Sequence, residues 1–341
     1  VWRKLHRNVL LDDREEILLS GDGQGDYALR EVIADYLHQA RGVNCEASQI
    51  VIGAGNEYLE LLLAQVLGKE KRVLMDDPTY VQAYRTFCNM GYEVHAVPHS
   101  HGSMPIETVR QENPDILYVM PSHQFPTGIV MPVRRRQELL FWAGEEPGRY
   151  LIEDDYDSEF RYRGKPIPSL QSSDKRGKVI YIGTFSKAIA PAIRVSYMVL
   201  PESLLEVYRR DCSFYSCTVS RIDQRILNEF IRDGYFERHL NKMRMHYRAK
   251  HDLLLAELEP FKKAFTISGE DAGLHLLLTA KGDVTEAQLL SAATEAGVKV
   301  YGMSENMVET DAPKATILLG FGSVSETDMK EGLHRLQKAW L

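Results

Sequence analysis

The sequence predicts an α/β protein whose mainly parallel central sheet is flanked by helices and followed by a small α+β domain. From about residue 50, short runs of branched and aromatic residues alternate with helical patterns, and strands separated by helices pair in parallel through crossovers. A length of 341 residues suits one large domain and a smaller one. The expected strands of the large domain are 73–75, 94–97, 116–120, 150–152, 179–182 and 195–200.

The helices are expected from their apolar spacing. After Gly55, residues Leu59, Leu62, Leu63 and Val66 repeat at the spacing of one helix face, so this helix should pack on the sheet. After residue 220 the pattern is helical over 222–232 and again over a basic segment, 236–258.

The last third of the chain reads as the small α+β domain. Apolar runs at 274–278, 298–301 and 316–321 alternate with helical patterns at 285–296 and 325–340. We therefore divide the chain into an N-terminal segment (1–45) that makes dimer and small-domain contacts, a large domain (46–258) and a small C-terminal domain (259–341).

Composition narrows the class of protein. A net charge of −7 argues against this chain holding nucleic acid by itself, because such binding rests on Lys and Arg contacts to phosphate. No apolar run reaches the ~20 residues that span a bilayer. Cys45, Cys88, Cys212 and Cys217 lack the clustered partners of a zinc site, so we expect no metal, reduced thiols and a cytoplasmic location. The start at Val1 rather than Met is what a piece of a longer polypeptide would show, but removal of Met or trimming would look the same.

One lysine stands in unusual surroundings. A buried strand at 179–182 runs into small and hydroxyl residues around Lys187. Schiff-base chemistry needs an amine that can lose its proton, and a desolvated lysine near other positive groups is suited to it. The alternative is a lysine that extends from a strand end into solvent, and this segment alone leaves both interpretations open.

Acidic residues and a phenol follow the strand at 150–152. Open parallel sheets bind ligands at the carboxyl ends of their strands, where Asp154 and Tyr156 are expected. An aspartate there could pair with the pyridine nitrogen of pyridoxal 5'-phosphate (PLP), and Tyr156 could donate to the ring oxygen. A helix cap or a solvated loop charge is the alternative for any one of these acids.

A phosphate site is expected where Gly55 opens a helix. Backbone N–H groups at a helix N-terminus attract anions. Arg194, Thr184 and Ser186 would complete the cup through hydrogen bonds, each charge-assisted one contributing about 1.5–3 kcal/mol.

With these residues in place, nearly the whole sequence resembles fold-type I PLP-dependent enzymes, in particular class I aminotransferases. It is most similar to the aminotransferase-like effector domains of MocR-type transcriptional regulators, a branch of the GntR family. The segments that carry this resemblance are 121–128 (PSHQFPTG), 153–162 (EDDYDSEFRY), 183–187 (GTFSK), 239–244 (HLNKMR) and 272–275 (AGLH).

The resemblance implies roles for individual residues. Lys187 would form the internal aldimine, Asp154 would pair with the pyridine nitrogen, Tyr156 would bind the ring oxygen and Tyr80 would stack on the ring. By itself, Tyr80 would more often be a half-buried aromatic at a strand end than a cofactor contact. The phosphate would be held, within the PLP-binding domain 46–258, by Gly55, Asn56, Glu57, Thr184, Ser186 and Arg194.

Two positions depart from the aminotransferase pattern. Phe125 precedes Pro126 where aminotransferases have an asparagine that bonds the ring oxygen. His123 or Gln124 could approach the ring instead, although either could equally be a loop residue with its hydrogen bonds satisfied locally. The late strand at 316–321 lacks the arginine that binds a substrate carboxylate. Recognition of an ordinary α-amino acid is therefore in question.

Three functions remain open. The first is an effector sensor of a MocR-type regulator, in which an amino compound forms an external aldimine and changes domain closure. The second is a free-standing class I aminotransferase with full turnover, and the third is a sensor of PLP itself. The resemblance also implies a homodimer, with DNA contacted only through a segment outside this chain.

Overall fold

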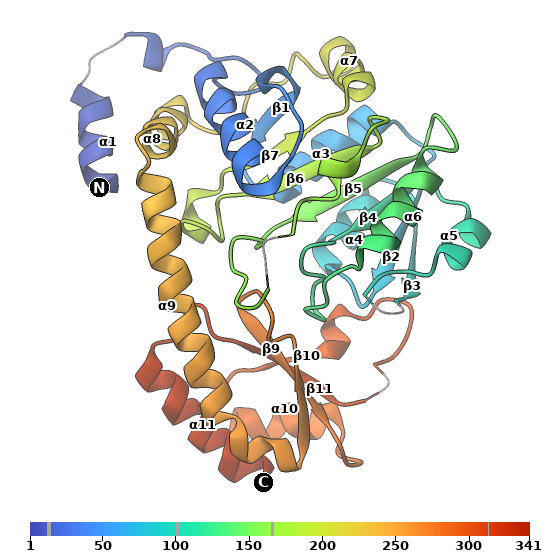
Figure 1. Cartoon of the computed structure of the whole chain (residues 1–341), viewed down its shortest axis with the longest axis vertical. Helices are drawn as coiled ribbons and strands as arrows, with labels where there is room; N and C mark the ends of the chain where they lie inside the picture. Colours follow the sequence, from blue (N-terminus) through green and yellow to red (C-terminus); the bar gives the residue numbers. More distant parts are fainter. Residues whose placement is uncertain (12–14, 100–101, 165–166, 313) are drawn as a thin grey trace.

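The computed structural model describes residues 1–11, 15–99, 102–164, 167–312 and 314–341. Two sheets organise it (Figure 1): a central sheet of seven strands in the order β1-β7-β6-β5-β4-β2-β3, and a second sheet of four in the order β10-β11-β9-β8. The strands of the central sheet are β1 (Ile50–Gly53), β2 (Arg72–Asp77), β3 (Glu93–Pro98), β4 (Ile116–Val119), β5 (Tyr150–Asp155), β6 (Val179–Thr184) and β7 (Ser196–Val199).

Parallel pairing dominates the central sheet. Strands β3, β2, β4, β5 and β6 pair in parallel, whereas β7 is antiparallel to both β6 and β1. The carboxyl ends of β2, β4, β5 and β6 therefore meet at one edge, which is where ligands bind in open α/β sheets. The predicted fold class is confirmed, with β7 and β1 as its antiparallel part.

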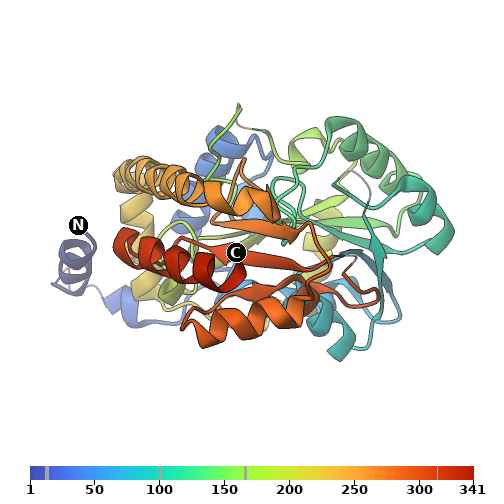
Figure 2. The ribbon, with the colours of Figure 1, turned by 90° about the horizontal axis from the view of Figure 1, so that it is seen from below.

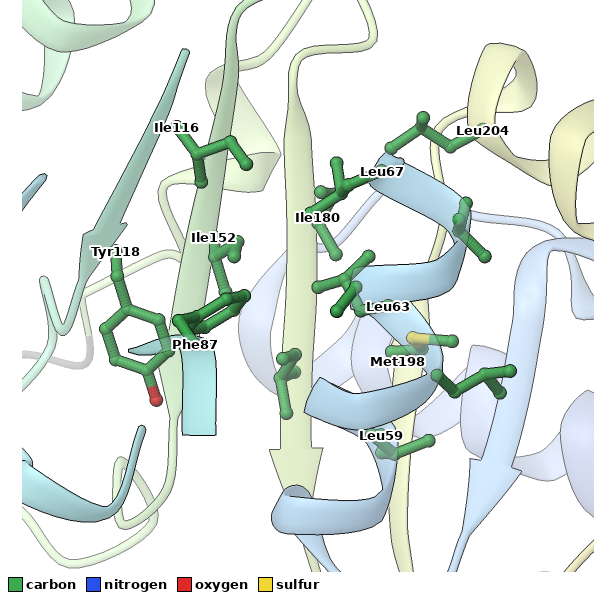
Figure 3. Packing of buried hydrophobic residues seen from close by; sticks show 14 of the residues in the cluster. Leu59, Leu63, Leu67, Phe87, Ile116, Tyr118, Ile152, Ile180, Met198 and Leu204 are labelled. Atoms are coloured by element: carbon green, nitrogen blue, oxygen red, sulfur yellow. The ribbon is translucent and has the colours of Figure 1, made fainter. Parts of the chain in front are cut away.

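Helices cover the sheet because successive strand residues face opposite sides. On one side lie α3 (Asn56–Leu67), α4 (Val81–Asn89) and α7 (Glu202–Asp211). Figure 3 shows Leu59, Leu63 and Leu67 of α3 directed at the sheet residues Ile180 and Met198. On the other side α5 (Ile106–Glu112) and α6 (Val133–Ala143) pack on β4 and β5, with Trp142 fully buried.

The N-terminal segment forms two helices that the sequence analysis did not predict. Helix α1 (Trp2–Leu11) packs on α8 (Arg221–Arg232), where the rings of Trp2 and Phe230 meet edge to face at 5.4 Å. Helix α2 (Tyr27–Arg41) packs on α8 and β1. The long helix α9 (Tyr235–Glu257) then runs from this layer to the second sheet (Figure 1).

The second sheet has one face covered by helices. α9, α10 (Glu286–Glu295) and α11 (Glu326–Trp340) pack on it, as Figure 2 shows from below. The opposite face buries Leu277 and Leu318 with Phe125 of the large domain. The strands of this sheet are β8 (Phe265–Ser268), β9 (His275–Ala280), β10 (Tyr301–Gly302) and β11 (Thr316–Gly320).

Short 3₁₀ helices also occur along the described chain. They are η1 (Glu15–Leu18), η2 (Ala47–Gln49), η3 (Gln171–Ser173), η4 (Pro191–Ile193), η5 (Glu259–Lys263) and η6 (Met303–Asn306).

Two further properties concern membrane spans and cysteines. Over the described residues, no helix has the length and apolar character needed to cross a membrane. All four cysteines are free. The domain boundaries proposed from the sequence stay predictions.

Candidate functional site

The candidate site lies where β5 and β6 end side by side. Asp154 pairs with Ile182 in the parallel register of these strands, so the segment after β5 and the turn that carries Lys187 leave the sheet together. Asp154 is buried, with 3% of its surface exposed. The carboxylate and the lysine predicted to serve one cofactor thus come from neighbouring strand ends.

Burial, together with the charge of the nearby acid Asp155, raises the pKa of the Asp154 carboxyl to about 7. Two donors oppose this effect only in part: the Tyr118 hydroxyl donates to Oδ2 at 2.6 Å, and the Asn56 amide reaches Oδ1 at 3.4 Å. No cation pairs with Asp154 among the described residues. A positively charged group of a ligand could therefore pair with this carboxylate.

The neighbouring acid Asp155 is differently placed. Its Oδ2 pairs with Arg41 Nε at 2.7 Å and also accepts the Tyr181 hydroxyl. Arg41 further donates to Ser122 Oγ and to the carbonyl of Ile167, both at 2.6 Å. Asp155 is therefore committed to holding α2 against the sheet, which leaves Asp154 as the acid available to a ligand.

A second buried acid lies behind Asp154. Glu60 of α3 has no exposed surface, its Oε1 lies 3.5 Å from the Tyr118 hydroxyl, and burial raises the pKa of its carboxyl to about 8. Glu60 and Tyr118 thus form a chain that ends on Asp154. Sequence reasoning missed both, although an acid beside Leu59 on the buried stripe of α3 was a readable signal.

Several of the residues predicted to hold a phosphate lie at the N-terminus of α3. Gly55, at φ +98°, leads into the helix, and a Cβ built there would lie 2.1 Å from Nη2 of Arg194. Arg194 adopts φ +46° after η4, and its Nη2 pairs with Glu57 Oε2 at 2.6 Å. The first N–H groups of α3 have no partner within the helix, so this corner offers donors and one guanidinium to an anion.

The two predicted hydroxyls differ in their contacts. Thr184 Oγ1 accepts from Ser196 Oγ at 2.9 Å and from the backbone N–H of Ser186 at 3.1 Å. Ser186 Oγ is buried and has no partner among the described residues. Ser186 is therefore the freer donor, while Thr184 shapes the turn before Lys187.

Tyr156 and His123 form one polar group. The Tyr156 hydroxyl lies 3.0 Å from His123 Nδ1, which is also 2.8 Å from Asp157 Oδ2. His123 Nε2 is buried and has no partner among the described residues. Gln124, the other residue expected to approach the ring, instead donates to the carbonyl of Pro78 at 2.9 Å and accepts the Thr127 hydroxyl.

Phe125 takes a central position. Its ring meets those of Tyr80, Tyr156 and His275 at centroid distances of 6.1, 6.2 and 5.5 Å. Tyr80 is half-buried, and its pKa is raised by burial and by the charge of Asp154. The residue that replaces the aminotransferase asparagine thus joins an aromatic wall around the site.

The small domain contributes His275 and Gly273 to the site. His275 Nε2 donates to the carbonyl of Pro126 at 2.8 Å, and burial lowers the pKa of the imidazole to about 4, so it is neutral at pH 7. A Cβ at Gly273 would lie 2.0 Å from Cε1 of His123. The two domains therefore touch at the site itself, and His275 was missed as a site residue.

A second contact between the domains lies next to Tyr80. The Asp77 carboxylate, at the end of β2, accepts the backbone N–H groups of Val308, Glu309 and Thr310 at 3.1, 3.2 and 2.8 Å, and the Thr310 hydroxyl at 2.9 Å. This carboxylate fixes a small-domain segment to the strand that leads into Tyr80.

Lys187 itself is exposed in the turn after β6. Of the two interpretations that the sequence left open for this lysine, the exposure of the residue in the chain alone agrees with the one that extends from a strand end into solvent. Its charge contributes to lowering the pKa of His275, so the two side chains lie near each other. A ligand between Asp154 and His275 would cover the amine.

PLP fits this arrangement. Asp154 lacks a cation that a protonated pyridine nitrogen would supply, and Ser186 Oγ and Asn56 Oδ1 are buried polar atoms without partners among the described residues. The donors at the start of α3 and Arg194 suit a phosphate. The residues predicted to hold the cofactor thus offer the complementary groups that it needs.

Comparisons with known proteins identify the family and relatives of this chain. Residues 1–336 match the family described as aminotransferase class I and II. The chain is 40% identical to the uncharacterized HTH-type transcriptional regulator YdeL of Bacillus subtilis over 99% of this chain and 73% of that protein. It is 32% identical to the probable rhizopine catabolism regulatory protein MocR of Rhizobium meliloti over 93% of this chain and 64% of that protein.

Solved structures show the same fold. A kynurenine aminotransferase of Pyrococcus horikoshii, solved with PMP, superposes with a TM-score of 0.84 at 26% identity, covering 99% of this chain and 86% of that one. An archaeal alanine:glyoxylate aminotransferase gives 0.86 at 24% identity, covering 99% and 85%. With the site and these relatives together, the chain belongs to the aminotransferase class I and II family, as the PLP-binding, aminotransferase-like domain of MocR-type transcriptional regulators.

Proposed function

We propose that this chain holds PLP through a Schiff base on Lys187 and senses an amino compound that takes over the link to the cofactor. The observation that carries the proposal is the buried Asp154 carboxylate, which has no cationic partner among the described residues and lies at the end of the strand beside Lys187. When bound, the cofactor supplies an aldehyde that condenses with amines and a ring that withdraws electrons from the bond formed.

Different residues of the chain would contact different parts of the cofactor. Asp154 would hold the pyridine nitrogen, Tyr156 the ring oxygen, and Tyr80 one face of the ring. The phosphate would lie between the start of α3, Ser186 and Arg194. Tyr118 keeps Asp154 in place through its hydrogen bond at 2.6 Å.

The effector would lie between the two domains, against His123 and His275. The late strand β11 has leucine rather than arginine facing the site, and Leu318 packs with Leu277 and Phe125. An effector recognised there would have an apolar part beside its amine, and it need not be an ordinary α-amino acid. Binding changes domain closure only if the effector has different affinities for the open and closed states. Closure would alter the contacts that Gly273 and Asp77 make between the two domains.

Two other functions remain as alternatives. In a free-standing aminotransferase Lys187 would also move the proton at the substrate Cα and turn over fully. In a sensor of PLP itself, binding of the cofactor would be the signal. For the regulator, we propose a homodimer that contacts DNA through a segment outside this chain.

Absorbance spectroscopy separates these functions. We expect the chain reconstituted with PLP to show a visible band, and candidate amines to shift it without steady release of a keto acid. Sustained release of a keto acid would instead establish an aminotransferase. A band that no amine shifts would favour the sensor of PLP. Lys187→Ala should lack the band, whereas Lys242→Ala, which removes an exposed lysine from α9, should keep it.

A further inference from the structure

The candidate phosphate cup contains an acid as well as a base. Glu57 lies in the first turn of α3, and its Oε2 is 2.6 Å from Nη2 of Arg194. About half of each side chain is exposed, 46% for Glu57 and 52% for Arg194, so solvent and ligands reach both. The carboxylate thus occupies a guanidinium donor that an incoming phosphate would use.

The backbone brings these two groups together. Gly55 has φ +98°, and a Cβ there would lie 2.1 Å from Arg194 Nη2 and 2.9 Å from Glu57 Oε2. The ion pair therefore sits directly over residue 55, at the end of α3 where the unpaired N–H groups point. A phosphate bound to those N–H groups would meet the carboxylate at close range.

We propose that Glu57 competes with the phosphate of the cofactor for Arg194, and so lowers the affinity of the chain for phosphorylated cofactor. This inference rests on the proposed binding of PLP and concerns the regulation of that same site. Two effects act together: Arg194 must leave Glu57 before it can donate fully to the phosphate, and the carboxylate repels the phosphate charge. Both effects are electrostatic and act between partly exposed groups, so added salt weakens them.

The competition has a consequence for the holo chain. Without the acid, the phosphate site would be half occupied at a lower cofactor concentration. With Glu57 present, a higher cofactor concentration is needed for the same occupancy. Occupancy then depends on cofactor supply as well as on the effector.

The test is a titration of the cofactor-free chain with PLP, followed by absorbance at low salt and at about 1 M salt. We expect Glu57→Gln to lower the dissociation constant roughly tenfold at low salt, and by a smaller factor at high salt. Glu57→Ala should shift it in the same direction. The matched control is Glu331→Gln, which breaks an exposed pair with Arg335 of 2.8 Å on α11 and should leave the dissociation constant unchanged.

Pyridoxal, which lacks the phosphate, provides the second probe. Its dissociation constant should be the same for the wild type and Glu57→Gln. A change of less than twofold with PLP, or an equal tightening for pyridoxal, would overturn the competition while leaving the link to Lys187 intact. If neither protein forms a visible band with PLP, the proposed function fails and the competition fails with it.

Discussion

Replacing Asp154 with asparagine should have two opposite effects. It should stabilise the cofactor-free chain, because a buried carboxylate destabilises the folded state, and it should weaken the binding of PLP. The carboxyl has an ordinary pKa of 3.8, and burial raises it to about 7 in the folded chain. The folded state therefore binds a proton more tightly than the unfolded state. Wild-type, cofactor-free protein loses stability from this group as pH rises from about 4 to about 7, and nothing more above pH 7.

The size of the effect follows from the shift. About three pKa units at about 1.4 kcal/mol each give roughly 4 kcal/mol as an upper limit. The asparagine oxygen keeps the hydrogen bond from Tyr118, but its amide group needs an acceptor, for which Asn56 Oδ1 is free among the described residues. We therefore expect Asp154→Asn to stabilise the cofactor-free chain by roughly 2–4 kcal/mol at pH 8.

Urea denaturation of the cofactor-free proteins at pH 5 and pH 8 measures this difference. The gain should be much smaller at pH 5 than at pH 8, and the same variant should bind PLP more weakly because the pyridine nitrogen loses its anion. Asp211→Asn, which changes an exposed acid, is the control and should leave the stability close to that of the wild type at both pH values. A variant no more stable than the wild type at pH 8, or equally stabilised at both pH values, would refute the reasoning.

Three further outcomes follow from the contacts around the site. Asp77→Ala removes the acceptor of three backbone N–H groups and one hydroxyl, so urea denaturation should show a loss of about 3–4 kcal/mol, and a loss under 1 kcal/mol would contradict the contact. Gly273→Ala should lower the thermal midpoint more than Gly91→Ala, because both have positive φ but only the Cβ at 273 meets other atoms; equal losses would contradict the clash. Tyr118→Phe should raise the pKa of Asp154 further, seen as a shifted pH dependence of the PLP band, and an unchanged profile would exclude this role.

The sequence predicted the central sheet well because its buried strands leave strong local signals. The predicted runs at 73–75, 94–97, 116–120, 150–152 and 179–182 fall on β2 to β6. The antiparallel pairing of β7 could not be read, because strand direction is fixed by tertiary pairing rather than by local composition. Strands β1 and β8 were not singled out, although β4 and β7, which were predicted, are equally short.

The candidate site was predicted from residues with recognisable chemistry, and the missed residues are those whose contacts with the site depend on the fold. Asp154, Tyr156 and Lys187 follow strands, so the sequence could place them at one edge. His275 and Phe125 meet only when the two domains come together, and no spacing along the chain announces that contact. The sequence left open whether Lys187 is desolvated or extends from a strand end into solvent, and the turn after β6 shows that this residue is exposed.

Glu57 shows a different limit. The sequence analysis expected this residue to help hold a phosphate, which its backbone N–H in the first turn of α3 allows. The structure adds that its carboxylate pairs with Arg194 at 2.6 Å. That pair joins residues 137 positions apart in the chain, so only the fold could reveal it.

The central claim is that the amine of Lys187 carries the cofactor opposite Asp154. Its most direct measurement is to reconstitute the chain with PLP, reduce it with borohydride, which converts a C=N link to a stable amine, and map the modified peptide by mass spectrometry. The account predicts one pyridoxyl group per chain, on Lys187, and none in Lys187→Ala. Modification spread over other lysines, or retained in that variant, would contradict it.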